Sequence, residues 1–288
     1  MPRTNFKELL EAGVHFGHLK KKYNPAMGPY VFMEQNGIHI IDLNKTVAML
    51  EDAASAMKQI AKSGKKILFV ATKKQAKSIV AEAAEKLSMP YITERWPGGM
   101  LTNFVTIRKA VKKMALIDRS KEDGTFNSLS KKERLAVDRS RAKLEKNLGS
   151  ISDMTRLPGA LFVVDTTREH IAVAEALKLK IPIFAMVDTN CDPNVIDYVI
   201  PSNDDASKSI DKIMTSVSNA VIEGLSNRKG ADEKAKNEAT STKPETSEKP
   251  AVEKKSTRKR VAAVEVKAAP EVKTPAVEVK TDASSEEE

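Results

Sequence analysis

Residues 67–87 read ILFVATKKQAKSIVAEAAEKL, and this stretch decides the fold. Its first five residues form an unbroken apolar run, which is typical of a strand buried on both faces of a sheet. Residues 74–87 follow with apolar side chains at helical spacing, namely Ala76, Ile79, Val80, Ala83 and Leu87. A buried strand followed by such a helix predicts one strand–helix unit of a parallel sheet.

The same alternation extends along the chain in both directions. The predicted helices are residues 5–11, 45–63, 169–179 and 205–225, and the other predicted strands are residues 30–33, 38–41, 91–93, 160–164, 183–187 and 198–200. Residues 13–18 carry two glycines and are expected to form a loop, while Asn36-Gly37 predicts a tight turn between strands. We therefore expect an α/β fold, doubly wound around a mostly parallel sheet with right-handed crossovers.

A basic segment interrupts this alternation. Residues 105–150 contain 13 basic and 6 acidic residues, whereas the whole chain of 288 residues has a net charge of +9. Apolar residues recur at three- and four-residue spacing on both sides of a turn at 122–125, which predicts two antiparallel helices packed along a coiled-coil seam. The expected organisation is an α/β domain formed by residues 1–104 and 152–228, with an inserted basic helical hairpin at 105–151.

The end of the chain has a different composition. Residues 229–288 contain 13 basic and 13 acidic residues and are rich in Lys, Glu, Ala, Ser, Thr and Pro. Such a segment buries too little apolar surface to offset the chain entropy lost on folding. It is therefore predicted to be a disordered low-complexity tail, with a weak RNA-contacting tether centred on 254–260 as the alternative.

Composition restricts the class of protein and its surroundings. The chain is 41% hydrophobic, which is enough for a substantial core, and its pI near 9.3 favours an anionic partner. The single cysteine, Cys191, cannot form an internal disulfide and fits a reducing cytoplasm. With no charged and apolar leader and no long apolar run, we expect a soluble cytoplasmic protein without a membrane partner.

The loops that hold nucleotide phosphates in α/β enzymes are missing. No Gly-x-Gly-x-x-Gly follows a predicted strand, and no Gly-x-x-x-x-Gly-Lys-Ser/Thr occurs. An enzyme using the sheet crevice for a nucleotide or sugar phosphate at Thr72-Lys73-Lys74 remains an alternative, because a helix N-terminus there could bind an anion. We predict no catalytic residue and no cofactor.

Metal ligation is also not expected. His15 and His18 lack the ligand spacing of zinc sites, His39 reads as a satisfied core or edge residue, and His170 opens a helix at the surface. The acidic segments 188–192 and 203–205 stand where strands end, so capping is the simpler interpretation. Nearby acids would raise the pKa of the Cys191 thiol, which argues against a nucleophile.

The loop RWPGGMLTN at residues 95–103 leads into the basic segment. Trp96 is expected to pack on the domain, and Thr102 or Asn103 to cap the following helix. The two glycines, Gly98 and Gly99, would also permit a close approach of the backbone to RNA. Both roles are compatible with one loop.

Basic residues outnumber acidic ones two to one in the predicted hairpin. This excess of positive charge favours a phosphate-bearing partner over the alternative that the charged face is only solvated. A scaffold that docks an acidic protein is the further alternative. The residues predicted to contact RNA are Arg3, His15, His18, Lys20, Lys21, Lys22, Arg95, Trp96, Asn103, Arg108, Lys109, Lys112, Lys113, Lys131, Lys132, Arg134, Arg139 and Arg141.

Seven separated blocks together resemble a known family, the bacterial or organellar form of small ribosomal subunit protein two. The resemblance covers about residues 6–222. The blocks are LLEAGVHFGH (9–18), NGIHIIDL (36–43), LFVATKKQA (68–76), RWPGGMLTN (95–103), LPGA (157–160), DTN (188–190) and IPSNDD (200–205). Any one block alone would be unspecific, whereas seven in order are highly specific.

The resemblance implies a flavodoxin-like α/β domain with an inserted coiled-coil hairpin. It also implies a structural, non-catalytic protein that is bound to small-subunit rRNA between the head and body of the ribosomal subunit in the cytoplasm. Its expected partners are that rRNA, neighbouring small-subunit proteins and the large mRNA-binding ribosomal protein one, which the family helps to recruit. We do not expect a homo-oligomer.

Overall fold

The computed structural model describes the backbone of residues 4–241 and the side chains of residues 4–228. Arg3, expected to contact RNA, and residues 242–288, expected to form most of a disordered tail, lie outside the described residues. Among the described helices, none combines the length and apolar character needed to cross a membrane.

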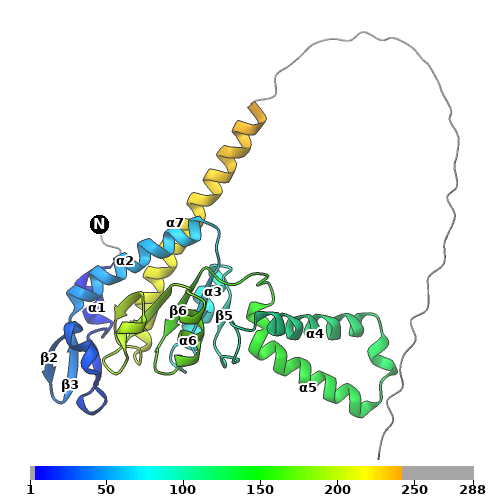
Figure 1. Ribbon diagram of the computed structural model, residues 1–288, viewed down its shortest axis with the longest axis horizontal. Coiled ribbons are helices and arrows are strands. Elements are labelled where there is room, and N and C mark those ends of the chain that lie inside the picture. The colour runs from blue at the N-terminus through cyan, green and yellow to red at the C-terminus, as the bar shows by residue number, and fades with distance from the viewer. Residues whose placement is uncertain (1–3, 242–288) are drawn as a thin grey trace, which may run out of the picture. The chain divides into compact units, whose positions relative to one another are not determined.

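The central sheet has five strands, all parallel to their neighbours (Figure 1). They are β4 (Ile67–Val70), β5 (Tyr91–Ile92), β6 (Ala160–Val164), β7 (Ile183–Val187) and β8 (Tyr198–Pro201), in the order β5-β4-β6-β7-β8. The chain starts this sheet at β4 and adds strands on both sides, which is the flavodoxin-like order. The predicted parallel α/β sheet is therefore confirmed.

Alternate side chains of each strand enter two separate cores. Ile67 and Phe69 pack with helices of one face, α2 (Leu43–Lys62), α3 (Lys77–Lys86) and α7 (Ser207–Ser241). Leu68 and Val70 pack on the other face with α6 (His170–Lys178) and with loop residues 96–101. Because successive strand residues point to opposite faces, a sheet covered on both faces requires the continuous apolar runs seen in the sequence.

A small antiparallel sheet follows the first helix, α1 (Phe6–Glu11). Its strands β1 (Phe16–Leu19), β2 (Val31–Gln35) and β3 (Ile38–Ile41) lie in the order β1-β3-β2. The prediction that residues 13–18 form only a loop is wrong, because β1 starts at Phe16. Gly17 misled that prediction: a Cβ there would lie 2.6 Å from the Thr189 side chain and 2.9 Å from the His39 carbonyl, so the glycine permits close packing of a strand.

Two helices separate β5 from β6 along the chain. These are α4 (Phe104–Glu122) and α5 (Lys131–Leu148), connected through Gly124 in the left-handed region and the 3-10 helix η3 (Thr125–Ser128). Helix α5 starts at Lys131, because Ser130 and Glu133 form a reciprocal capping box. We call α4, η3 and α5 the arm; it runs away from the sheet in Figure 1.

Ile107 and Val111 of α4 and Leu144 of α5 are partly buried against the core at the base of the arm. Asp118 of α4 pairs with Arg141 of α5, and Lys121 pairs with Asp138. Partner numbers on α5 fall as those on α4 rise, which is the pattern of an antiparallel helix pair.

Helix α7 extends to Ser241, so the predicted end at residue 225 is wrong and the expected tail boundary at residue 229 falls inside the helix. The apolar period that guided the prediction stops near Leu225, whereas residues 226–241 remain rich in helix formers such as Lys, Glu and Ala. The remaining elements are 3-10 helices, η1 (Lys20–Lys22), η2 (Pro25–Tyr30), η4 (Gly149–Ile151) and η5 (Pro193–Val195).

Gly224 sets the close crossing of α7 over α2. A Cβ on this glycine would lie 2.5 Å from the backbone carbonyl oxygen of Lys58 and 3.0 Å from the Cβ of Ala61. We expect Gly224→Ala to lower the free energy of unfolding by about 1–3 kcal/mol, because the helices must separate. Urea denaturation of the purified protein measures this change.

Gly149→Ala is the matched control for this substitution. Gly149 has a helical backbone, and its added Cβ would meet only the Glu145 side chain at 3.6 Å. The free energy of unfolding of the Gly149→Ala variant should stay within about 0.5 kcal/mol of the parent value or rise slightly. Equal losses of unfolding free energy in the two variants would show that the close α2–α7 crossing does not require a glycine at position 224.

Candidate nucleic-acid interface

A cluster of buried charges lies between β1 and the carboxyl ends of the sheet strands. His18 bonds through Nδ1 to Asp188 Oδ2 at 2.7 Å. Lys73 lies 2.8 Å from Asp204 Oδ1 and 2.6 Å from Asp205 Oδ1. Parallel strands end at the same edge of a sheet, so the segments after β4, β7 and β8 meet here although they are far apart in the sequence.

The environment of this cluster changes the acidity of its groups. Burial and the charges of Asp188 and Asp165 raise the pKa of Asp204 to about 7, although Lys73 acts in the opposite direction. The hydrogen bond to Asp188 raises the pKa of His18 despite burial of the ring. The Oδ2 atom of Asp204 is buried and has no hydrogen-bond partner within the described structure.

Three ligand atoms in this cluster could hold a metal ion. One atom each from His18, Asp188 and Asp204 lies within 4.8 Å of the other two. Imidazole nitrogen and carboxylate oxygen together suit zinc better than magnesium, which prefers oxygen ligands alone. The sequence interpretation of Asp188 and Asp204 as mere capping residues missed this convergence, because nothing in the spacing shows that 188 and 204 meet residue 18.

The structure shows where the N-terminal histidines lie and corrects the expectation for His39. The ring of His18, which is predicted to contact RNA, lies between Asp188 and Asp205, and these carboxylates disfavour a phosphate beside it. His39 was expected to be a satisfied residue, yet both of its ring nitrogens are buried without a hydrogen-bond partner in the described part of the chain. His15 is half-buried against the Phe16 ring, and burial lowers its pKa, so it carries little positive charge at neutral pH.

The lysines beside these histidines remain at the surface. Lys20 pairs with Glu34 at 2.9 Å, while Lys21 and Lys22 are exposed in η1. Lys22 also acts on the carboxylate of Asp205, whose pKa its charge helps to lower against the effect of burial. Of this basic run, Lys21 and Lys22 are the residues best placed to meet an anion.

One buried carboxylate organises the loop that leads into the arm. Glu175 of α6 accepts hydrogen bonds from the Trp96 indole nitrogen at 3.1 Å and from the backbone nitrogens of Gly99 at 2.8 Å and Leu101 at 2.9 Å. Thr102 adds its backbone nitrogen at 3.0 Å and its hydroxyl at 3.1 Å. Burial alone would raise the pKa of Glu175, but these bonds lower it overall, so the carboxylate stays charged.

This arrangement confirms the structural role expected for Trp96 in the loop. Trp96 is 6% exposed and bonded to Glu175, so it packs on the domain as expected, whereas its contact with RNA stays a prediction. Asn103 precedes α4, but its side chain caps no backbone nitrogen and instead accepts a bond from the Thr106 hydroxyl at 2.8 Å. Arg95 is exposed. Glu175 itself had one signal in the sequence, a carboxylate on the apolar side of a helix.

The outer surface of the arm carries a set of cations with no ion pair among the described residues. All are exposed on α4 or α5, and their charge is therefore available to an anion. The predicted RNA-contacting residues in this set are Lys109, Lys112, Lys113, Lys131, Lys132 and Arg139.

The other predicted cations of the arm are bonded within the protein or half-buried. The side chain of Arg141, which is predicted to contact RNA, is 28% exposed and pairs with Asp118 and Glu145, each at 2.5 Å. Arg108 donates to the Thr155 carbonyl at 3.2 Å at the base of the arm. Arg134 is half-buried, and its Nε has no hydrogen-bond partner in the described structure. Arg141 is therefore a structural residue that joins the two arm helices.

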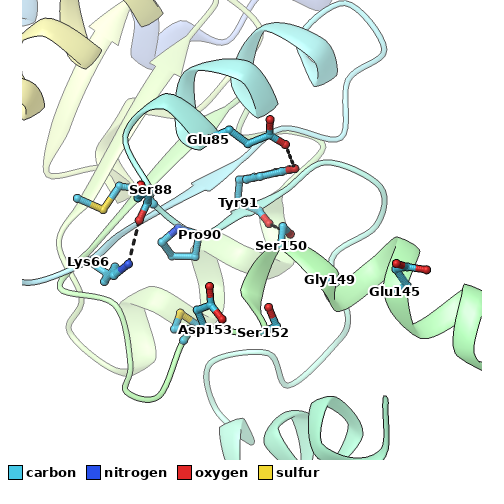
Figure 2. A pocket seen from close by; sticks show the side chains of 12 residues that line it. Lys66, Glu85, Ser88, Pro90, Tyr91, Glu145, Gly149, Ser150, Ser152 and Asp153 are labelled. Atoms are coloured by element: carbon cyan, nitrogen blue, oxygen red, sulfur yellow. Dashed lines mark hydrogen bonds between the residues drawn. The ribbon is translucent and has the colours of Figure 1, made fainter. Parts of the chain in front are cut away.

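A pocket of about 630 Å³ lies between the base of the arm and the sheet (Figure 2). Lys66 donates to the Ser88 carbonyl at 2.8 Å, and the Tyr91 hydroxyl donates to Glu85 at 2.6 Å. Glu85, Glu145 and Asp153 line this pocket with only one cation, Lys66, so its charge disfavours a phosphate. The pocket does not belong to the candidate interface.

These features define a basic α/β protein of flavodoxin-like strand order that carries a cationic helical arm. Residues 9–224 match the family model described as ribosomal protein S2, and the chain belongs to that family. This match covers nearly all of the described fold and leaves out the residues after 224.

Similar proteins carry the name small ribosomal subunit protein uS2. The protein of Christiangramia forsetii is 70% identical over 245 residues, covering 85% of this chain and 82% of that relative. The protein of Flavobacterium johnsoniae is 72% identical over 226 residues, covering 78% and 89%. That of Bacteroides thetaiotaomicron is 64% identical over 245 residues, covering 84% and 88%.

Glu175→Gln tests whether the hydrogen bonds to Glu175, which we call the Glu175 clamp, hold the loop that leads into the arm. The amide retains one acceptor oxygen for five donors, so buried N–H groups lose their partner and the free energy of unfolding should fall by about 2–3 kcal/mol. A lowered pKa in the folded protein means that the carboxylate stabilises it above pH 4.5 and that this contribution disappears as pH falls further. The difference between parent and variant, measured by urea denaturation, should therefore shrink in acid.

Glu85→Gln is the control for this prediction, since exposed Glu85 accepts one surface hydrogen bond from Tyr91. It should change stability by less than about 1 kcal/mol. A Glu175→Gln loss no larger than this, or one independent of pH, would contradict the assigned role of the clamp.

Zinc binding provides the test of the buried cluster. We expect Zn²⁺ to raise the melting temperature of chelator-treated protein, with a stabilisation of about 2.7 kcal/mol when its concentration is a hundred times the dissociation constant. Asp204→Asn should abolish this shift, because it removes one of the three ligands. Asp205→Asn, one residue away and outside the group of three, should keep it. Identical zinc responses in parent and Asp204→Asn would exclude the site.

Proposed function

We propose that this protein is a structural, non-catalytic component of the small ribosomal subunit that binds rRNA and acts on the ribosome in the cytoplasm. Membership of the ribosomal protein S2 family and the names of the similar proteins support this role. The observation that carries the RNA contact is the set of exposed cations along the arm that form no ion pair with the described side chains.

The arm would bind RNA mainly through the phosphate backbone. We interpret it as an antiparallel coiled-coil hairpin, residues 105–151, inserted into an α/β domain formed by residues 1–104 and 152–228. Flexible lysines at helical spacing form point-charge contacts with phosphates and carry little base specificity. Ion pairs such as Arg141–Asp118 join the helices, so the remaining lysines are presented on a stiffened support.

A protein partner would use a different face. Phe6, Leu10, Phe16, Phe32 and Met33 are exposed apolar side chains that line one groove in the N-terminal region, and Phe32 is 71% exposed. A contiguous apolar patch of this kind marks a protein interface more often than an RNA contact. We propose that neighbouring small-subunit proteins, including the large mRNA-binding ribosomal protein one, dock here and that the protein sits between head and body.

The two alternative functions have weaker support. An enzyme that holds a phosphate at Thr72-Lys73-Lys74 would need a free Lys73, but its ammonium lies within 4.0 Å of three carboxylates, those of Asp165, Asp204 and Asp205. A scaffold for an acidic protein could use the same arm cations. Nuclease treatment separates that scaffold from the rRNA-binding role, because only RNA-mediated association is lost.

The arm is tested by changing Lys109, Lys112 and Lys113 to Gln together. We expect weaker incorporation into small subunits in reconstitution followed by co-sedimentation. The slope of log affinity for rRNA against log salt should also decrease by about 2–3 in magnitude, since each phosphate contact contributes roughly 0.7–0.9. The α/β fold should be unaffected, as judged by circular dichroism and thermal melting.

A triple change of Lys62, Lys86 and Lys178 to Gln removes the same charge from exposed positions outside the arm. This control should incorporate like the parent protein. Parent-like incorporation and an unchanged salt slope for the arm variant would reject the arm as the RNA anchor.

A further inference from the structure

A second pocket, of about 580 Å³, lies at the carboxyl edge of the central sheet. We call it the switch-point pocket; its walls include Thr72, Arg95, Pro97, Asn147, Arg168 and Glu169. Thr72 follows β4, Arg95 follows β5 and Arg168 follows β6. The chain reverses its direction of strand addition between β4 and β6, and ligands of doubly wound sheets bind at that position.

The loops around this pocket are fixed by buried carboxylates. Glu169 accepts a bond from the Thr72 backbone nitrogen at 3.0 Å, which joins the loops after β6 and β4. Asp165, whose φ of 68° is in the left-handed region, accepts bonds from the backbone nitrogens of Thr167 and Arg168. Glu175 holds the third wall through the loop after β5. A preformed pocket requires little ordering when it binds a ligand.

The charge of the pocket favours an anion. Arg95 and Arg168 are exposed and form no ion pair among the described residues. Of the two acids that line the pocket, Glu94 already pairs with Lys77 at 3.4 Å and with Lys146 at 3.3 Å. Burial raises the pKa of Glu169, while its bonds to Thr72 and the charge of Arg168 act in the opposite direction.

The remaining walls fit a nucleoside. Guanidinium groups bind phosphate oxygens in a bidentate manner, and Arg planes also stack on bases. Pro97 and the exposed side chain of Ile171 provide apolar surface for a base, and the Asn147 amide can both donate and accept hydrogen bonds. The volume is in the range of about 300–1,000 Å³ that accommodates small ligands.

We propose that the switch-point pocket receives one unstacked nucleotide of the bound rRNA, with its phosphate at Arg95 and Arg168 and its base against Pro97 and Ile171. The proposal rests on the proposed function. Asn147 belongs to α5, so the pocket opens beside the base of the arm, and an RNA strand held by the arm passes its rim. Protein recognition of RNA commonly uses such splayed-out bases.

The experiment places a photoreactive residue in the pocket. Protein carrying Ile171→p-benzoylphenylalanine is assembled into small subunits, irradiated, and its crosslink to rRNA is mapped by primer extension. We expect a crosslink at one unpaired nucleotide. A probe at Leu177, which is exposed on the same helix but outside the pocket, should not give this crosslink. Adding Arg95→Gln and Arg168→Gln should reduce the yield at least about five-fold, whereas Arg156→Gln, an exposed arginine outside the pocket, should not.

Co-sedimentation of the same samples distinguishes a failure of the proposed function from a failure of the pocket assignment. Failure of the parent protein to co-sediment with small subunits would overturn the proposed function itself. Normal co-sedimentation without an Ile171 crosslink, or with a crosslink unaffected by the arginine changes, would overturn only the pocket assignment. A melting assay of the free protein with added GMP or AMP tests the binding of a free nucleotide. A rise in melting temperature that depends on Arg95 and Arg168, without a crosslink to rRNA, would assign the pocket to a free nucleotide and would also overturn the proposal.

Discussion

The carboxylate of Glu175 joins the two functional parts of this molecule. It lies on α6, which packs against the sheet, and it binds the loop that starts α4. A buried charge is stable only when polar partners replace its lost hydration, and here five donors from one loop do so. The buried Glu175 carboxylate and the loop residues bonded to it therefore set the direction in which the arm leaves the domain.

The protein divides its cations between internal and external use. Arg141, Lys121 and Lys146 pair with acids of the arm or its base, and Lys73 neutralises part of the acidic cluster at the sheet edge. The paired residues support the fold. The lysines on the outer surface of α4 and α5, which pair with no acid in the described part of the chain, leave an excess of positive charge. An arm with all its cations paired would have no electrostatic reason to bind a polyanion.

Periodicity in the sequence was sufficient to predict the parallel sheet, because the strands at 160–164 and 183–187 are continuous apolar runs with the predicted bounds. It was also sufficient to predict two helices in the basic segment. It failed where glycine permits close packing instead of a turn, as at Gly17, and where helix formers continue without an apolar face, as after Leu225. The buried cluster of His18, Asp188 and Asp204 depends on contacts across more than 150 residues, which no local pattern reveals.

At the carboxyl edge of the sheet, the loop after β4 separates two regions of opposite charge, the acidic cluster and the switch-point pocket. Lys73 bonds Asp204 in the acidic cluster, whereas the adjacent Thr72 bonds Glu169 beside the switch-point pocket. An acidic cluster repels phosphate, and unpaired arginines attract it. A polyanion that reaches this edge is therefore directed toward Arg95, Arg168 and the arm. The apolar groove around Phe32, on which we place the proposed protein contacts, belongs to the N-terminal region. The proposal therefore assigns RNA and protein partners to different surfaces of one molecule.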